Sequence, residues 1–169
     1  KQLEFKRVPA TEGNDGVVIS SLLKETGLVT LDSGFMNTAS CESKITYIDG
    51  DAGILRYRGY PIEQLAKNST FLEVAWLLIH GELPDMATYE AFLHRLKRHR
   101  LLHEDFRAFF GAFPANGHPM AVLQAGIAGL ATYYQHTLDP KDPVQVDKAT
   151  TLLLAKVPTM IAHIFRRAQ

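Results

Sequence analysis

The stretch from Thr70 to Ile79, which reads TFLEVAWLLI, decides the fold class of this chain. Thr70 and Glu73 form a capping box, in which the hydroxyl and the carboxylate satisfy free amides at the start of a helix. The residues that follow are apolar almost all round, which predicts a deeply buried helix. Gly81 and Pro84 end it, because glycine closes helices and proline cannot continue them.

Helical spacing continues beyond this stretch. Asp85 caps a longer helix whose far end is basic, and a short aromatic helix lies within residues 101–113. The pair His118-Pro119 opens a helix that continues to about Tyr134. The alanines and glycines of that helix predict close approach by neighbouring helices.

A last helix is expected from about Val144 toward Gln169, bent or interrupted near Pro158. Its apolar face has to pack against an earlier helix or a partner. The residues of that face are Met160, Ile161, Ile164 and Phe165.

The first 60 residues read instead as strands and turns. The clearest signal is a hairpin over residues 44–58, where two β-rich runs flank the loop Gly50-Asp51-Ala52-Gly53. Shorter strand-like runs cover residues 3–8, 17–19 and 28–31. The prediction is therefore a mainly α chain, with a small β region over residues 1–60 and the first part of a larger helical domain over residues 61–169.

Composition narrows the class of protein. Apolar residues make up 46% and charged residues 21%, as in compact domains with a core. Eighteen basic and eighteen acidic residues cancel, so we expect neither a nucleic-acid partner nor a membrane partner. The single cysteine, Cys41, suits a reducing cytoplasm, and we expect it to be a buried and inert thiol.

The usual cofactor and metal patterns are incomplete. The glycine-rich loop at residues 50–53 lacks the lysine of a phosphate-binding loop. Asp49 and Asp51 resemble the start of a calcium loop, but Tyr60 stands where a bidentate glutamate is needed, so we interpret them as hairpin-turn aspartates. His99 and His103 would share a helix face only if the helix continued past Leu101, and a zinc site needs further ligands. No metal or cofactor is predicted.

The one concentrated cluster of positive charge lies at the carboxyl end of the helix that Asp85 caps. Such a cluster can hold a phosphate or an anionic nucleotide, or it can be a solvated helix end whose cations complement the helix dipole. Both interpretations stay open. The cluster consists of Arg95, Lys97, Arg98, His99 and Arg100.

Residues 34–66, GFMNTASCESKITYIDGDAGILRYRGYPIEQLA, closely resemble bacterial citrate synthases of the type II-like, actinobacterial variety. The resemblance continues, in the order of the family, through FLEVA (71–75), GELP (81–84), HPM (118–120) and LLAKVPT (153–159). It implies a mainly α fold with a small amino-terminal β region and a homodimer or larger oligomer. It also implies a cytoplasmic enzyme of the tricarboxylic acid cycle that condenses acetyl-CoA, oxaloacetate and water to citrate and CoA.

The same resemblance implies that this chain is the amino-terminal part of such an enzyme and is inactive alone. The family's His-Ala-Asp-His-Glu and Gly-Pro-x-His-Gly-Gly motifs do not occur between Lys1 and Gln169, so no catalytic residue is carried over. Two alternatives stay open. One is a binding or assembly module that uses the face at Ile161, Ile164 and Phe165, and the other is a 2-methylcitrate synthase, against which the extended β region argues.

One family site overlaps the chain. Some members are inhibited by NADH at a site to which Arg98, His99, Tyr134 and Lys156 correspond. Leu152 stands where that site has an arginine, and Arg100 and Leu101 also depart from its pattern.

Overall fold

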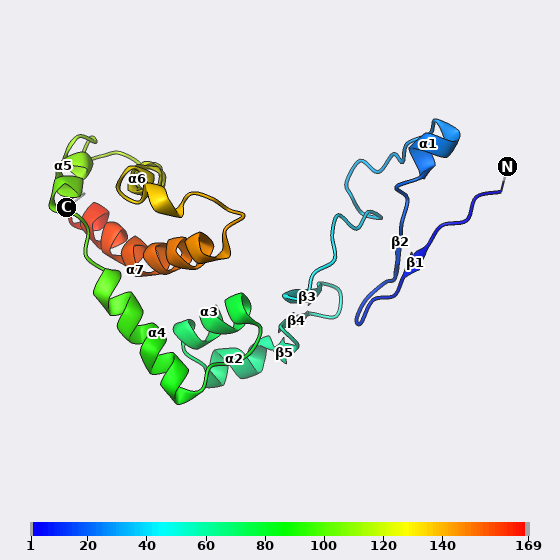
Figure 1. Cartoon of the computed structure of the whole chain (residues 1–169), viewed down its shortest axis with the longest axis horizontal. Helices are drawn as coiled ribbons and strands as arrows, with labels where there is room; N and C mark the ends of the chain where they lie inside the picture. Colours follow the sequence, from blue (N-terminus) through cyan, green and yellow to red (C-terminus); the bar gives the residue numbers. More distant parts are fainter. Residues whose placement is uncertain (1, 168–169) are drawn as a thin grey trace. The chain divides into compact units, whose positions relative to one another are not determined.

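The structure is a computed structural model that describes residues 2–167. It divides into two compact units, residues 1–84 and 85–169, and each is described by itself. Figure 1 shows the short strands and helices of the first unit and the longer helices of the second.

Two small antiparallel sheets lie in the first unit. Strand β1 (Arg7–Val8) pairs with β2 (Gly16–Val17), while β3 (Thr46–Asp49), β4 (Ile54–Tyr57) and β5 (Tyr60–Pro61) form a second sheet in that order. Asp49 lies opposite Ile54, which confirms the predicted hairpin. The Asp49 carboxylate accepts a hydrogen bond from the Ala52 amide at 2.9 Å, as a turn aspartate does.

The amino-terminal part differs from the prediction in three places. A short helix, α1 (Leu22–Thr26), is present where only strands and turns were predicted, and Gly27 closes it at φ 73°. The predicted strand at residues 28–31 is wrong: its side chains are exposed, and among the described residues no strand pairs with it. Cys41 is exposed, so the expectation of a buried thiol is also wrong.

The helix from the opening stretch forms as predicted but is less buried. Helix α2 (Ile62–Asn68) precedes α3 (Phe71–His80), which begins with both hydrogen bonds of the capping box and ends at Gly81 with φ 99°. Among the described residues of α3 only Leu77 is fully buried, and Phe71 is 74% exposed. The short elements of the first unit are too few to surround a helix on all sides, so deep burial was the wrong inference.

Arg58 joins the hairpin to α3. Its backbone takes the left-handed conformation at φ 51°, in the turn between β4 and β5. Its amide donates to the Ile45 carbonyl at 2.7 Å, and its Nη2 donates to the Leu78 carbonyl at 2.8 Å. The guanidinium therefore satisfies a carbonyl in the last turn of α3, where helices leave acceptors free.

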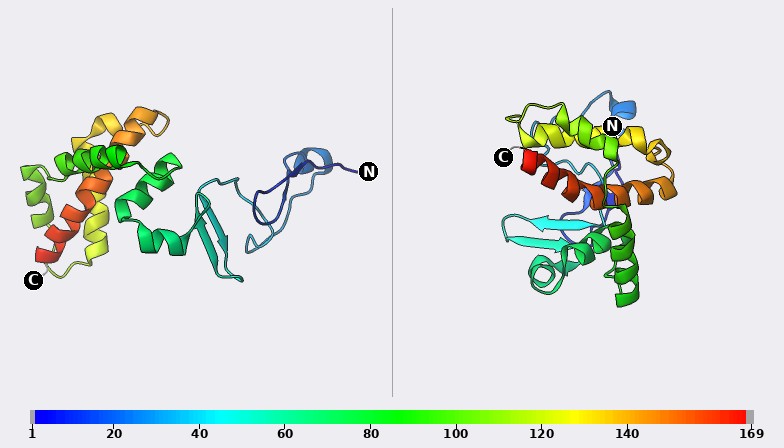
Figure 2. Two further views of the ribbon diagram at one scale, coloured as in Figure 1. Left: turned by 90° about the horizontal axis from the view of Figure 1, so that it is seen from below. Right: turned by 90° about the vertical axis from the view of Figure 1, so that its left-hand side faces the viewer.

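The second unit is helical, as predicted. Helix α4 (Met86–His99) begins at Asp85, whose carboxylate accepts from the Thr88 amide at 2.8 Å. Helices α5 (Glu104–Gly111) and α6 (Pro119–Tyr133) follow, then a 3₁₀ turn, η1 (Gln135–Thr137), and α7 (Pro143–Arg167). Helices α6 and α7 pack side by side (Figure 2).

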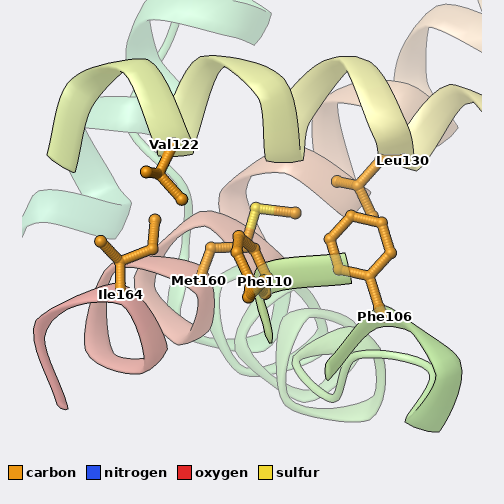
Figure 3. Packing of buried hydrophobic residues seen from close by; sticks show 6 residues of the cluster. All are labelled: Phe106, Phe110, Val122, Leu130, Met160 and Ile164. Atoms are coloured by element: carbon orange, nitrogen blue, oxygen red, sulfur yellow. The ribbon is translucent and has the colours of Figure 1, made fainter. Parts of the chain in front are cut away.

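A compact apolar core joins α5, α6 and α7. In Figure 3, Val122 faces Ile164 at one end, Leu130 lies near Phe106 at the other, and Met160 and Phe110 lie between them. Close approach depends on small residues, as predicted: a Cβ on Gly126 would lie 3.1 Å from the Phe110 ring.

Helix α7 continues through Pro158, so the predicted interruption is absent from the described helix. The four residues of its predicted apolar face differ in burial. Met160 and Ile164 are buried in the core, whereas Ile161 and Phe165 are 50% and 61% exposed. Earlier helices of the same chain therefore cover half of the face that needed a partner. No described helix combines the length and the apolar character that crossing a membrane requires.

Candidate functional site

The residues predicted to bind a nucleotide lie where α7 meets the end of α4. Lys156 is only 2% exposed, and its amine donates to the Leu101 carbonyl, just beyond α4. The same amine lies 5.3 Å from the centre of the Tyr134 ring, within the range of a cation–π contact. Lys156 and Tyr134 are thus in contact, and the buried ammonium is compensated by a carbonyl and an aromatic face.

A second bond ties α7 to the same segment. The Thr159 hydroxyl donates to the Arg100 carbonyl at 2.8 Å. Arg100 is the C-terminal cap of α4, so Lys156 and Thr159, one turn apart on α7, together bind the chain where α4 ends. This arrangement gives Lys156 a structural role in addition to any part in binding.

The other two candidates are not bonded to Tyr134 or Lys156 among the described residues. Arg98 and His99 are exposed in the last turn of α4, and within residues 2–167 no hydrogen bond or ion pair joins either to Tyr134 or Lys156. Leu152 is buried one turn before Lys156, so an apolar side chain occupies the position where the family resemblance implies an arginine.

Part of the basic cluster is already paired. Arg95 makes two hydrogen bonds to the Asp147 carboxylate, at 2.8 and 3.2 Å, and so links α4 to α7. Arg95 therefore has a structural partner, while the cations Lys97 and Arg98 are exposed beside the negative end of the α4 dipole, next to the exposed His99.

The histidine pair considered for zinc does not share a helix. Helix α4 ends at His99, and His103 is the N-cap of α5, where its Nδ1 accepts from the Asp105 amide at 3.3 Å. Across residues 2–167, no three His, Cys, Asp or Glu side chains gather as a metal site would require.

A carboxylate organises the loop that begins the segment of family resemblance. Asp32 accepts hydrogen bonds from the Thr38 hydroxyl at 2.7 Å and from the amides of Asn37 and Met36 at 2.9 and 3.1 Å. These donors, with the Thr38 hydroxyl foremost, hold the pKa of Asp32 below its ordinary value.

The second unit also contains an apolar cavity of about 260 Å³. One wall is the α5–α6 loop with the start of α6, and the other is the last turns of α7. Arg167 borders it and donates to the Gly111 and Phe113 carbonyls at 2.8 and 2.5 Å. The main lining residues are Phe110, Phe113, Pro114, Met120, Leu123, Ile161 and Phe165.

Comparison with known proteins identifies the family. The family model described as "Citrate synthase, C-terminal domain" matches residues 34–169. "Citrate synthase 1" of Mycobacterium tuberculosis is 53% identical over 167 residues, which are 99% of this chain and 39% of that protein. Citrate synthase of Corynebacterium glutamicum is 53% identical over 98% of the chain and 38% of its own length.

Solved structures agree with this assignment. The crystal structure of citrate synthase from Pyrobaculum aerophilum superposes with a TM-score of 0.70 at 32% identity, covering 80% of this chain and 36% of that one. The fold thus defines a mainly helical protein of the citrate synthase type. The chain belongs to the citrate synthase family, and it spans about 39% of the length of the curated relatives it matches.

Proposed function

We propose that this chain is the amino-terminal part of a citrate synthase, which condenses acetyl-CoA with oxaloacetate and water to give citrate and CoA. The observation that carries the proposal is the 53% identity to mycobacterial citrate synthase over 99% of the chain. The matched region covers nearly all of both units.

In this proposal the chain supplies framework and the rest of the polypeptide supplies the reacting groups. Two histidines and an aspartate carry the reaction: the aspartate takes a proton from the acetyl methyl group, and a histidine polarises the thioester carbonyl. The resulting enol attacks oxaloacetate, with electrostatic stabilisation of the enolate-like state. The motifs that hold these groups are absent from the sequence of residues 1–169.

The remaining features follow from the same proposal. Acetyl-CoA and oxaloacetate are substrates, and the reaction needs no metal or cofactor. The enzyme would act in the cytoplasm as a homodimer or larger oligomer in the tricarboxylic acid cycle.

Regulation by NADH is a separate proposal for the same enzyme. The contact between Tyr134 and Lys156 supports it, because an aromatic ring and an ammonium can bind a nucleotide together. The buried Leu152, and the absence among the described residues of a bond from the exposed Arg98 and His99 to Tyr134 or Lys156, weigh against tight binding. Titration of the active enzyme with NADH, with Lys156→Met as the comparison, tests this directly.

The activity test compares two proteins and two thioesters. The whole polypeptide that carries this sequence and the chain ending at Gln169 are each assayed for oxaloacetate-dependent release of CoA from acetyl-CoA and from propionyl-CoA. We expect the whole polypeptide to prefer acetyl-CoA and the chain to be inactive. A preference for propionyl-CoA would support a 2-methylcitrate synthase, and turnover by the chain alone would overturn the division of roles.

A further inference from the structure

Helices α5 and α6 share an uncommon start, because each is capped by a histidine. His103 Nδ1 accepts from the Asp105 amide at 3.3 Å, and His118 Nδ1 accepts from the Met120 amide at 3.2 Å. An imidazole can accept at Nδ1 only while it is neutral and its proton is on Nε2, because protonated histidine is a donor at both nitrogens. Each cap therefore depends on the ring remaining unprotonated.

The cap matters especially at α6. Pro119 is the first residue of the helix and has no amide hydrogen, while the Ala121 and Val122 amides both donate to the His118 carbonyl. The Met120 amide is thus the free donor of the first turn that the His118 ring satisfies.

The two caps differ in the acidic residues near them. The first turn of α5 contains Glu104 and Asp105, and the Asp105 carboxylate lies 3.4 Å from His103 Nδ1, so a proton on His103 gains an ion pair. The first turn of α6 has no acidic residue. A proton on His118 therefore places an uncompensated positive charge at the positive end of the helix dipole.

The elements beside the α6 start do not supply that compensation. On α7 the cation Arg167 borders the same cavity as Gly117 and Pro119, and the His163 ring lies tilted beside the Phe110 ring. On α5 the charged and titratable groups are His103, Glu104, Asp105 and Arg107, and the Glu104 carboxylate pairs with Arg107. Within residues 2–167, no carboxylate forms an ion pair or hydrogen bond with His118.

We propose that His118 is a pH-sensitive cap whose protonation loosens the first turn of α6 and the adjoining wall of the apolar cavity. Imidazoles commonly gain a proton between pH 5 and 8. The cap requires a neutral His118 ring, so acidification that protonates this ring removes the cap. Pro114, Gly117, Pro119 and Met120 line the cavity beside His118, and that wall loosens with the cap.

Hydrogen exchange in the full chain tests the proposal. Protection of the Met120, Ala121 and Val122 amides, corrected for intrinsic exchange, is measured at pH 8 and pH 5. We expect a roughly three- to tenfold loss of protection at pH 5, the range that loss of an N-cap produces. In His118→Asn the amide oxygen caps without titrating, so we expect a change below about twofold.

His103→Asn is the matched control. It changes the other histidine cap and should leave the response of α6 intact. Equal protection of the α6 start at both pH values in the unaltered chain would overturn the proposal, as would a full response that survives in His118→Asn. The ¹⁵N shifts of the His118 ring at pH 8 should show the proton on Nε2, and the opposite tautomer would contradict the cap itself.

A separate measurement tests whether protonation of His118 loosens the cavity wall. Fluorescence of an apolar dye should rise on acidification in the unaltered chain and rise less in His118→Asn. Equal dye responses in the two proteins would refute the loosening of the cavity wall.

Discussion

Gly126 lies where α6 crosses the Phe110 ring, and its missing side chain sets the distance between α6 and α5. A Cβ at this position would lie 3.1 Å from two atoms of that ring. Phe110 is almost fully buried and meets the rings of Phe106, Phe109 and His163, so it has little room to move away.

We therefore expect Gly126→Ala to destabilise the chain by about 1–3 kcal/mol, the usual cost of overpacking, despite the better helix propensity of alanine. Urea unfolding followed by circular dichroism measures the difference. Gly129→Ala is the control, because its Cβ would lie at an easier 3.4 Å from Phe106. If Gly126→Ala were as stable as the control, the tight packing described here would be wrong.

Lys156 is the other residue whose role is clear from its contacts. Lys156→Met keeps most of the apolar volume and removes both the hydrogen bond to the Leu101 carbonyl and the cation–π contact with Tyr134. We expect a loss of about 1–2 kcal/mol in the free energy of unfolding. Lys148→Met, at an exposed position of the same helix, should change stability by less than about 0.5 kcal/mol. Equal losses in both variants would contradict the structural role of Lys156.

These residues show what the sequence can and cannot predict. The caps at Thr70, Asp85 and His118 are local, because each partner lies within three residues, and all three were predicted as helix starts. The Lys156 bond joins positions 55 residues apart, and the bond from Arg58 to the Leu78 carbonyl spans 20. No local pattern reveals such partners. The Tyr134–Lys156 part of the candidate site was foreseen only through the family resemblance.

At the scale of elements, the start of α3 makes a prediction about pH. Hydrogen bonds from the Thr70 amide and hydroxyl hold the pKa of Glu73 below its ordinary value. A lowered carboxyl pKa stabilises the fold above the pKa of the unfolded chain, and this stabilisation is lost as the pH falls through the folded value. We expect the stability difference between the unaltered chain and Glu73→Gln to stay constant from pH 7 to about 5. It should narrow only as the pH falls below the ordinary value of 4.5 toward the lower folded value.

Thr70→Ala provides the comparison at the same cap. It removes the hydroxyl partner and should cost about 1 kcal/mol at pH 7. Thermal unfolding across the pH series measures both variants. A difference between the unaltered chain and Glu73→Gln that stays constant over the series would exclude the proposed titration of the capping box.

Elements with a strong local signal were predicted well, and those that depend on distant packing were not. The hairpin follows from its turn glycines, and the helices of the second unit follow from their caps and from the helical spacing of their apolar residues. Helix α1 was missed, and the apolar run at residues 28–31 forms no strand, because a strand also needs a partner that the run itself cannot specify. Helix α7 passes through Pro158 because Met160 and Ile164 beyond it pack into the core.

At the scale of the whole molecule, the two units belong to a family whose curated relatives are much longer. The chain spans about 39% of the length of the mycobacterial relative. The division into a β region over residues 1–60 and a helical part over residues 61–169 stays a prediction, while the structure itself separates compact units after Pro84.

The most direct test of the central proposal is the identity of the product. The whole polypeptide carrying this sequence is incubated with oxaloacetate and acetyl-CoA labelled with ¹³C in the acetyl group, and the products are analysed by mass spectrometry. We predict labelled citrate that forms only when both substrates and the protein are present. If labelled citrate were absent while the folded protein consumed neither substrate, the assignment of citrate synthase activity would be contradicted.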